Sequence, residues 1–575
     1  MKQKPFSDRI MLVAARWHAN RLYNAFLRAT ASATNCQDVL LGKLLARNAD
    51  SVYGRDRGFD GIHSYADFAR QVPIQDYDDL APYIERVKAG ELNALFGSGQ
   101  KVLMFALTSG TSDRPKYIPV TEDFLNHFRR GWNIFGVKAL MDHPGSFLRP
   151  IVQVSSPMDE SYTSAGIPCG AITGLMAATQ KRLVRKYYVC PRRLAYIRDF
   201  TSRYYTIMRF SIPRADASFM VTASPATILK LARTADEHRE QMVRDIRDGT
   251  VSPEMDVAAD IRAHLNSKLE PDPATARRLE KLIEKHGALL PKHYWNLSFL
   301  ANWTGGTMGL YLQHYPYYFG DVPVRDIGLL ASEGRMSIPV EDGTPAGILD
   351  VVGNFYEFVP AGQIESDSPT TLRSHEVEVG REYFILLTNS AGLYRYNIGD
   401  LVRVTGFQGQ APIIEFLNKG THISSLAGEK LTERQAVLCV ENVCREQHIR
   451  IDNFVLAPRW DDPPYYLLHV EHNGESGWDP GLLAEWLETA LCRHNCEYES
   501  KRKSGRLGRV RVSTLPPGTL HRHDLALRRR FRKHSNEQYK HQFLYTRPGQ
   551  DDGLEAMAPV GGVTANEEVT GDAGR

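Results

Sequence analysis

The stretch Thr108-Ser109-Gly110-Thr111-Ser112-Asp113-Arg114-Pro115-Lys116 places five consecutive hydroxyl or glycine residues directly after an apolar run, 102–107. The apolar run predicts a buried strand, and the polar residues predict the loop that follows it. Hydroxyl and backbone N–H groups can hold phosphate oxygens, glycine lets the backbone come close, and a lysine adds positive charge. An ordinary Ser/Thr turn has the same composition, and the spacing is not that of a Walker A loop. The candidate phosphate-binding residues are Thr108, Ser109, Gly110, Thr111, Ser112 and Lys116.

The chain as a whole is typical of a globular protein with two large or about four smaller domains. It has 575 residues, of which 42% are hydrophobic and 24% charged, and its formal net charge is +3. Such a balance does not require nucleic acid or an anionic membrane as a partner. The 7 cysteines are too sparse for a disulfide scaffold, and no apolar run approaches a membrane span of roughly 18 residues. We therefore expect a cytoplasmic protein.

Strand and helix signals alternate through the first part of the chain and become strand-rich later. A second apolar run, 218–222, precedes a Ser-Pro pair and a helical pattern, which is typical of an α/β layer. The charged stretch 236–287 predicts two helices separated at Pro271 and Pro273. From residue 327 onward, short apolar runs separated by glycines predict strands. The predicted fold class is α/β, with a large N-terminal α/β domain that includes a β-rich part.

A change of pattern after residue 417 predicts a second domain. The polar stretch 418–421 has the composition of a hinge. Beyond it, a helix, a hairpin, a second helix and a strand predict a small α+β module. Large apolar residues become rare from Pro548, as in disordered tails. The predicted parts are therefore a large domain, 1–417, a small domain, 418–547, and a disordered tail, 548–575.

Further motifs follow the loop in order along the chain. They are Trp303-Thr304-Gly305-Gly306, Ser332-Glu333-Gly334, Tyr356-Glu357-Phe358, Tyr394-Arg395-Tyr396-Asn397-Ile398-Gly399-Asp400 and Gly428-Glu429-Lys430-Leu431-Thr432-Glu433. Together with the loop at 108–116, this order resembles the acyl-adenylate-forming superfamily. The Tyr-Arg-Tyr form resembles more particularly the auxin-responsive Gretchen Hagen family, the acyl acid amido synthetases, and their bacterial relatives. The resemblance extends over roughly residues 35–545.

The resemblance implies a role in adenylation for each motif of the large domain. It implies that the loop and Lys116 hold the β- and γ-phosphates of ATP and that Ser332 contributes to the nucleotide site. It also implies that Glu333 holds Mg²⁺, which prefers hard oxygen ligands. Asp400 would bind the two ribose hydroxyls, which suit two carboxylate oxygens. A surface-turn carboxylate and a β-turn aspartate are the plain alternatives for Glu333 and Asp400.

The small domain contributes two further candidates by the same resemblance. The family carries a catalytic lysine in a Gln-Tyr/Phe-Lys-x-Pro-Arg segment, and Lys540 follows Gln-Tyr here, with Gln542-Phe543 in place of Pro-Arg. Lys540 is therefore the candidate catalytic lysine, with a merely solvated lysine as the alternative. Lys430 is a candidate contact to the nucleotide. Relatives usually have arginine where Lys419 stands, so a bidentate contact made by that arginine is in doubt.

The resemblance implies an ATP-dependent ligase that works in two steps. A carboxylic acid and ATP give acyl-AMP and pyrophosphate, and an amine, expected to be an amino acid, then forms an amide and releases AMP. Trp303 is the candidate wall of the pocket for the acid. We expect the small domain to rotate between the steps and favour a monomer. Alternatives are a ligase that forms a thioester with coenzyme A or a carrier protein, and an adenylate binder that has lost activity.

Two other patterns have simpler interpretations. Residues 501–545 contain 13 Lys or Arg and 2 acidic residues, which is the pattern of a nucleic-acid-binding protein. Few aromatics interleave, so a solvated basic face beside a nucleotide site is preferred, and no nucleic-acid partner is predicted. Cys492, His494 and Cys496 lack the four paired ligands of a zinc site, and two cysteines four residues apart are typical of one helix face.

Overall fold

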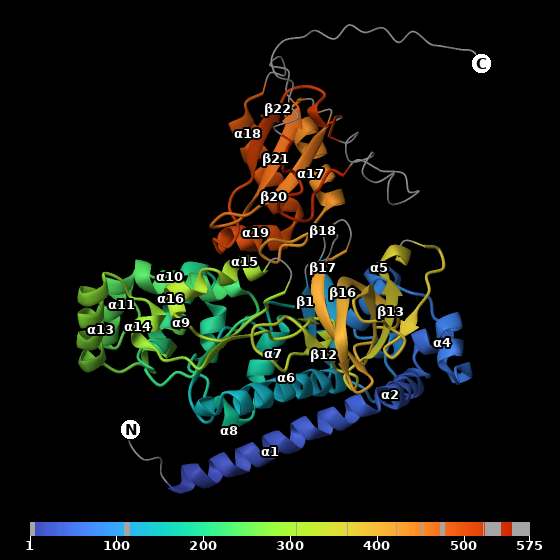
Figure 1. The fold of residues 1–575 in the computed structure, drawn as a ribbon, viewed down its shortest axis with the longest axis horizontal. Helices are drawn as coiled ribbons and strands as arrows, with labels where there is room; N and C mark the ends of the chain where they lie inside the picture. Colours follow the sequence, from blue (N-terminus) through green and yellow to red (C-terminus); the bar gives the residue numbers. More distant parts are fainter. Residues whose placement is uncertain are drawn as a thin grey trace. The chain divides into compact units, whose positions relative to one another are not determined.

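The computed structural model describes residues 6–108, 115–305, 308–364, 366–420, 423–449, 451, 453–471, 478–520, 522–523 and 542–554. Contacts within the chain separate two compact units, Met1–Gly420 and Thr421–Arg575, which we call the large and the small unit (Figure 1). The large unit combines helices with several sheets, and the small unit is α+β. The predicted α/β fold class is therefore confirmed.

The described residues of the large unit that precede residue 102 are mostly helical. The helices are α1 (Phe6–Ala31), α2 (Ala33–Asn48), α3 (Val52–Asp56), α4 (Tyr65–Gln71) and α5 (Tyr77–Lys88). Side chains fix the starts of the later helices: Asp76 accepts hydrogen bonds from the first turn of α5 in a capping box. Gln37 on α2 is buried and donates to the carbonyls of Val351 and Asn354 at 2.7 and 2.8 Å, which joins this helical layer to the central sheet.

A seven-stranded antiparallel sheet forms the β-rich part of the large unit. Its strand order is β11-β12-β17-β16-β15-β13-β14. The strands are β11 (Ser337–Ile338), β12 (Gly347–Leu349), β13 (Phe355–Pro360), β14 (Leu372–Arg373), β15 (Glu382–Thr388), β16 (Tyr396–Gln408) and β17 (Ala411–Lys419). β16 and β17 pair over most of their length and carry the last motifs before the small unit.

Two further sheets place the predicted loop and the α/β layer. The first has the order β2-β1-β5-β4, and the second is a parallel sheet of order β3-β6-β7-β8. Their strands are β1 (Val102–Thr108), β2 (Lys116–Thr121), β3 (Ile151–Gln153), β4 (Ser161–Tyr162), β5 (Pro168–Gly170), β6 (Phe219–Val221), β7 (Phe299–Ala301) and β8 (Val324–Arg325). A short hairpin pairs β9 (Leu330–Ala331) with β10 (Gly334–Arg335). One buried apolar cluster connects these sheets with the helices.

The remaining α-helices of the large unit lie from α6 to α16 in chain order, and several gather at one end of the unit in Figure 1. They are α6 (Glu122–Asp142), α7 (Ile172–Ala178), α8 (Arg182–Arg185), α9 (Phe200–Ser211), α10 (Pro225–Glu237), α11 (Arg239–Asp248), α12 (Ala259–Asn266), α13 (Pro273–His286), α14 (Pro291–Tyr294), α15 (Gly309–Leu312) and α16 (Tyr315–Phe319). None of the described helices is long and apolar enough to cross a membrane.

The charged stretch 236–287 has one more break than the two-helix prediction allowed. In addition to the break at the prolines, α11 ends at Gly249, which has a left-handed φ of 72°. A Cβ at this position would lie 2.6 Å from the backbone nitrogen of Pro271. Glycine therefore ends α11 and lets the chain approach the proline segment, so that α12 forms as a separate helix.

The small unit is built around a three-stranded sheet of order β20-β21-β22. The predicted hairpin is confirmed by the antiparallel pairing of β20 (Phe454–Arg459) with β21 (Tyr465–Glu471), and β22 (Arg511–Leu515) joins in parallel. The other elements are α17 (Glu433–Glu446), α18 (Pro480–His494), α19 (Cys496–Lys503) and the short pair β18 (Ile423–Ser424) and β19 (Leu431–Thr432). These helices and strands enclose a separate apolar core.

The start of the expected tail differs from the prediction. Residues 548–554 form turns, and Leu554 is fully buried in a cluster with Leu515 and Tyr545. Asp551 is also buried and accepts a hydrogen bond of 2.7 Å from His469 on β21. A scarcity of large apolar residues suggested disorder here, but a few buried contacts are sufficient to order the segment. The remaining tail residues lie outside those described.

Candidate functional site

The predicted phosphate loop connects two adjacent strand ends. β1 and β2 pair antiparallel, with Thr108 directly opposite Lys116. The loop residues Ser109, Gly110, Thr111 and Ser112 lie outside the described part of the chain. Lys116 is half-buried, with its Nζ 5.5 Å from the centre of the Tyr77 ring. Burial lowers the pKa of the Lys116 ammonium, and the negative charge of Glu333 opposes this shift.

The acidic motif forms a two-residue turn between β9 and β10. Ala331 pairs with Gly334, which leaves Ser332 and Glu333 at the tip, with Ser332 half-buried and Glu333 only 5% exposed. The Glu333 carbonyl accepts a hydrogen bond of 2.8 Å from Asn389. A free surface turn, the plain alternative for Glu333, therefore does not describe this buried and fixed position.

Asp400 lies within β16 and faces Lys419 on β17. The two residues are paired in register, and the Lys419 Nζ donates to Asp400 Oδ1 at 2.9 Å and to the Ile398 carbonyl at 2.8 Å. Asp400 is 4% exposed, so it is a buried strand residue rather than a turn aspartate. Burial favours a lower pKa for Lys419, but the charges of Asp400 and Glu333 outweigh it and raise this pKa.

Three predicted site residues and Lys419 therefore form one group, which we call the charged cluster: Lys116, Glu333, Asp400 and Lys419. Glu333 acts electrostatically on both lysines, and Lys419 in turn acts on Lys116. Tyr396 is buried beside them; burial, followed by Glu333 and then other negative groups, raises its pKa well above the ordinary range. Two cations and two carboxylates in a poorly solvated site provide charges of both signs for a phosphorylated ligand and its metal ion.

The arginine of the Tyr-Arg-Tyr motif has a structural role that the sequence did not predict. Arg395 is buried, and its Nε donates to both carboxylate oxygens of Glu357 on β13 at 3.0 Å. Its Nη1 donates to the carbonyls of Ala69 and Val72 at 2.8 Å. The arginine thus fastens α4 to the central sheet. The Tyr356-Glu357-Phe358 motif supplies its partner, so the two motifs meet in one buried ion pair.

Trp303 follows β7 and is held by hydrogen bonds. Its Nε1 donates to the Gly328 carbonyl at 2.9 Å, and the ring packs half-buried against the main core. The next residue, Thr304, donates from its backbone N–H and its hydroxyl to Asp326 at 2.6 and 2.8 Å. Burial raises the pKa of Asp326 to about 6 in spite of these hydrogen bonds. The position of Trp303 is fixed, and its role as a wall of the pocket for the carboxylic acid stays a prediction.

The remaining candidates belong to the small unit. Lys430 lies immediately before β19 with a left-handed φ of 48°, in a turn shaped by Glu429. The two Glu429 carboxylate oxygens accept hydrogen bonds from the backbone N–H groups of Leu426 and Ala427 at 2.6 and 2.7 Å. Lys540 lies outside the described residues. The roles of both lysines therefore stay predictions.

A protein-only metal centre is absent from the part of the chain that the structure describes, where no three His, Cys, Asp or Glu side chains come together. The ring of His494 instead lies 3.0 Å from the Asn442 amide, and burial raises the pKa of the Cys492 thiol to about 11. A single buried carboxylate, Glu333, fits Mg²⁺, because this ion is commonly held by one or two carboxylates together with substrate phosphates and water.

Comparison with known proteins agrees with the order of these motifs. The sequence matches the GH3 family N-terminal domain over residues 22–324, the GH3 family central domain over 347–419 and the GH3 family C-terminal domain over 434–548. It is 26% identical over 528 residues to jasmonoyl–L-amino acid synthetase JAR4 of Nicotiana attenuata, covering 86% of this chain and 88% of that protein. It is 24% identical over 507 residues to indole-3-acetic acid-amido synthetase GH3.2 of Arabidopsis thaliana, covering 80% and 88%.

A solved structure has the same fold. The AtGH3.15 acyl acid amido synthetase in complex with 2,4-DB matches with a TM-score of 0.64 and 20% sequence identity, covering 95% of this chain and 96% of that one. The N-terminal domain alone accounts for more than half of the chain, and the three domains follow in order. The chain therefore belongs to the GH3 family, the amide-forming ligases that its motifs predicted.

Proposed function

We propose that this protein is an ATP-dependent acyl acid amido synthetase that joins a small carboxylic acid to an amino acid. The charged cluster carries the proposal, because it brings the phosphate-loop lysine, the acidic motif and the predicted ribose ligand into one electrostatic group. The named relatives form amides between acids and amino acids, which supports the same reaction type here. The cytoplasmic location and the monomeric state expected from the sequence remain predictions.

In the first step, a carboxylate oxygen of the acid attacks the α-phosphorus of ATP, and pyrophosphate leaves. Lys116 is the first residue of β2 and lies opposite Thr108, where the loop begins. From this position it would neutralise negative charge on the phosphate oxygens. Asp400 would accept hydrogen bonds from the ribose hydroxyls while Lys419 keeps its charge balanced. Glu333 would hold Mg²⁺, which would supply positive charge to the phosphate groups.

In the second step, the amine attacks the carbonyl carbon of the acyl-adenylate, and AMP leaves as the amide forms. The acyl group is already activated, so no nucleophilic side chain is needed. Lys540 is proposed to stabilise the charge that develops in the adenylation step. The small domain would bring it to the site by rotation, which allows different contacts in each step.

Two assays test this proposal with the full chain. Acid-dependent exchange of pyrophosphate into ATP, screened over aryl, indole and fatty acids, reports the first step. Mass spectrometry of products formed with amino acids, and in parallel with coenzyme A, reports the acceptor. We expect exchange with at least one acid and an amide as product. Formation of a thioester without any amide would assign the chain to the coenzyme A ligases instead, and no exchange with any acid would support an inactive adenylate binder.

A substitution at Lys540 tests the role proposed for that lysine. Lys540→Ala should lower the rate of pyrophosphate exchange by about 10²-fold or more while ATP binding changes little, because the lysine acts on the transition state. Lys533→Ala removes a lysine from the same stretch of sequence as the matched control. Exchange at the wild-type rate in Lys540→Ala would show that this lysine is only solvated.

A further inference from the structure

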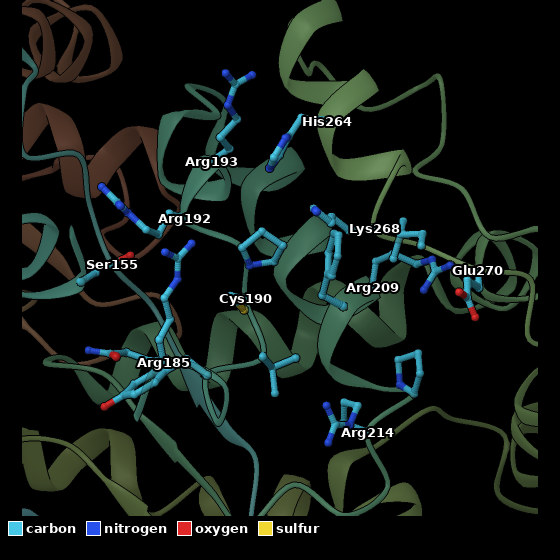
Figure 2. A pocket seen from close by; sticks show the side chains of 18 of the residues that line it. Ser155, Arg185, Cys190, Arg192, Arg193, Arg209, Arg214, His264, Lys268 and Glu270 are labelled. Carbon is cyan, nitrogen blue, oxygen red and sulfur yellow. The ribbon is translucent and has the colours of Figure 1, made fainter. Parts of the chain in front are cut away.

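The large unit contains a pocket that the proposed chemistry does not use. Its volume is about 900 Å³, and its lining comes from residues 153–272, between β3 and the start of α13. No residue of the charged cluster lines it. Figure 2 shows Arg185 and Arg192 on one side of the hollow, Lys268 and Glu270 on the other, and Arg214 at its foot. The volume is that of a pocket for one small molecule.

The lining of this pocket is strongly cationic. Six Arg or Lys residues line it, against the acidic residues Glu270 and Asp272; the six are Arg185, Arg192, Arg193, Arg209, Arg214 and Lys268. Some of this charge is already balanced by the protein. Of these six, Arg193 lies 3.5 Å from Asp260, and Arg214 lies 3.1 Å from Asp216.

Arg209 is the buried member of the pocket lining. It is 2% exposed, and it donates to the backbone carbonyls of Thr250 and Asp245 at 2.9 and 2.8 Å. Carbonyl partners carry no net charge, so they satisfy the guanidinium without neutralising it. Burial accordingly lowers the pKa of Arg209, and Asp245 only partly opposes this. A buried cation facing a pocket is stabilised by any anion that enters.

Three cations at the rim remain without an ion pair in the described part of the chain: Arg185, Arg192 and Lys268. All three are exposed and come from α8, from the segment before α9, and from the turn after α12. Side chains from three separate segments converge on one hollow, which differs from the single solvated face expected of a charged helix. A ligand with one negative charge would leave most of the positive charge of the pocket without a partner.

We propose that this pocket binds a small organic anion that carries several phosphate groups, at a site separate from the charged cluster. Arginine forks bind phosphate oxygens in pairs, and multiple arginines match multiple phosphates. Phe210 and the prolines at 191 and 213 add apolar wall, which suits the organic part of such a molecule. The limited volume favours a compact ligand over a nucleic-acid strand, which would need an extended track.

Isothermal titration of the full chain with inositol hexakisphosphate tests the proposal. The triple variant Arg185→Gln, Arg192→Gln, Lys268→Gln, which we call the rim variant, removes the three positive charges that have no ion pair. The matched control removes three exposed charges from the neighbouring helix α13: Arg277→Gln, Lys281→Gln, Lys285→Gln. We expect the rim variant to bind about tenfold more weakly or worse, the control to stay within about twofold, and wild-type affinity to fall as salt rises.

Three outcomes would overturn the proposal. Equal weakening in both triple variants would mean that only overall charge matters. Loss of binding in Lys116→Met, with the rim variant unaffected, would place the polyphosphate at the charged cluster. Absence of binding to wild type, or displacement of the probe by a short RNA at lower concentration, would exclude a small polyphosphate as ligand. Acid-dependent pyrophosphate exchange should stay at the wild-type rate in the rim variant, which shows that it is folded and separates this test from that of the proposed function.

Discussion

Replacing Arg395 with lysine should loosen the large unit while leaving its charge unchanged. The guanidinium makes five hydrogen bonds in a buried position: two to Glu357, one each to the Ala69 and Val72 carbonyls, and one of 3.1 Å to Thr371. An ammonium group has three donors and no planar fork. It can keep the ion pair with Glu357, whose side chain is 1% exposed, but it cannot reach all the other acceptors.

The expected cost follows from the contacts that are lost. At least two hydrogen bonds from a charged donor disappear, and each contributes about 1.5–3 kcal/mol, so Arg395→Lys should destabilise the large unit by about 3 kcal/mol or more. Arg395→Met should cost about 3–5 kcal/mol, since it leaves the buried Glu357 without a charge partner. Adding Glu357→Gln to Arg395→Met should recover part of that loss.

Hydrogen exchange followed by mass spectrometry suits this measurement, because a chain with two units need not unfold in one step. Peptides from β13 and β16 should exchange faster in Arg395→Lys, whereas peptides from β20 and β21 in the small unit provide an internal control. The KM for ATP should stay within about threefold of wild type at temperatures where the variant is folded. An unchanged rate of hydrogen exchange in β13, together with a rate of pyrophosphate exchange lowered by about 10²-fold, would refute the structural role and make Arg395 a catalytic residue.

Three further variants test the charged cluster and the buried Asp326. Glu333→Gln should lower the rate of pyrophosphate exchange by about 10²-fold and raise the Mg²⁺ concentration needed for half-maximal rate, and an unchanged Mg²⁺ dependence would argue against the metal role. Asp400→Asn should raise the KM for ATP by about tenfold and leave the half-buried Lys419 without its ion-pair partner; full activity with an ATP analogue that lacks ribose hydroxyls would contradict the ribose assignment. Asp326 has a pKa of about 6, so the folded protein keeps a proton that the unfolded chain releases near pH 4. Stability should therefore fall by up to about 3 kcal/mol as pH rises from about 4 to 6, and Asp326→Asn should remove this dependence in thermal melts made across that range.

Motifs that combine a strand end with a polar turn could be predicted from the sequence. The apolar run before Thr108 and the acidic turn at Glu333 both lie where the pattern placed them, at the ends of short strands. Local patterns are sufficient in these places because the chemistry and the backbone signal occupy the same few residues. The order of such motifs then indicated the family, although 24–26% identity leaves most positions different from the relatives named above.

Features assembled from distant segments could not be predicted in the same way. The partners of Arg395 lie far from it in the sequence, and only the tertiary structure shows that they are Glu357 and two carbonyls of the α4 region. The cationic pocket has a similar origin. Its arginines occur singly or in pairs across residues 185–214, so no basic run marks them, while the basic run that the sequence does contain lies elsewhere.

The lysine at position 419 shows how a departure from a family pattern can retain the contact that matters. An arginine there could bind a carboxylate with two parallel hydrogen bonds, and lysine cannot. Yet the in-register pairing of β16 with β17 sets Lys419 directly opposite Asp400, and the ammonium reaches both that carboxylate and the Ile398 carbonyl. A point charge held by strand register needs no planar fork to balance a buried aspartate. We infer that the substitution preserves the charge balance at the proposed ribose site, so the inactive adenylate binder gains no support from this position.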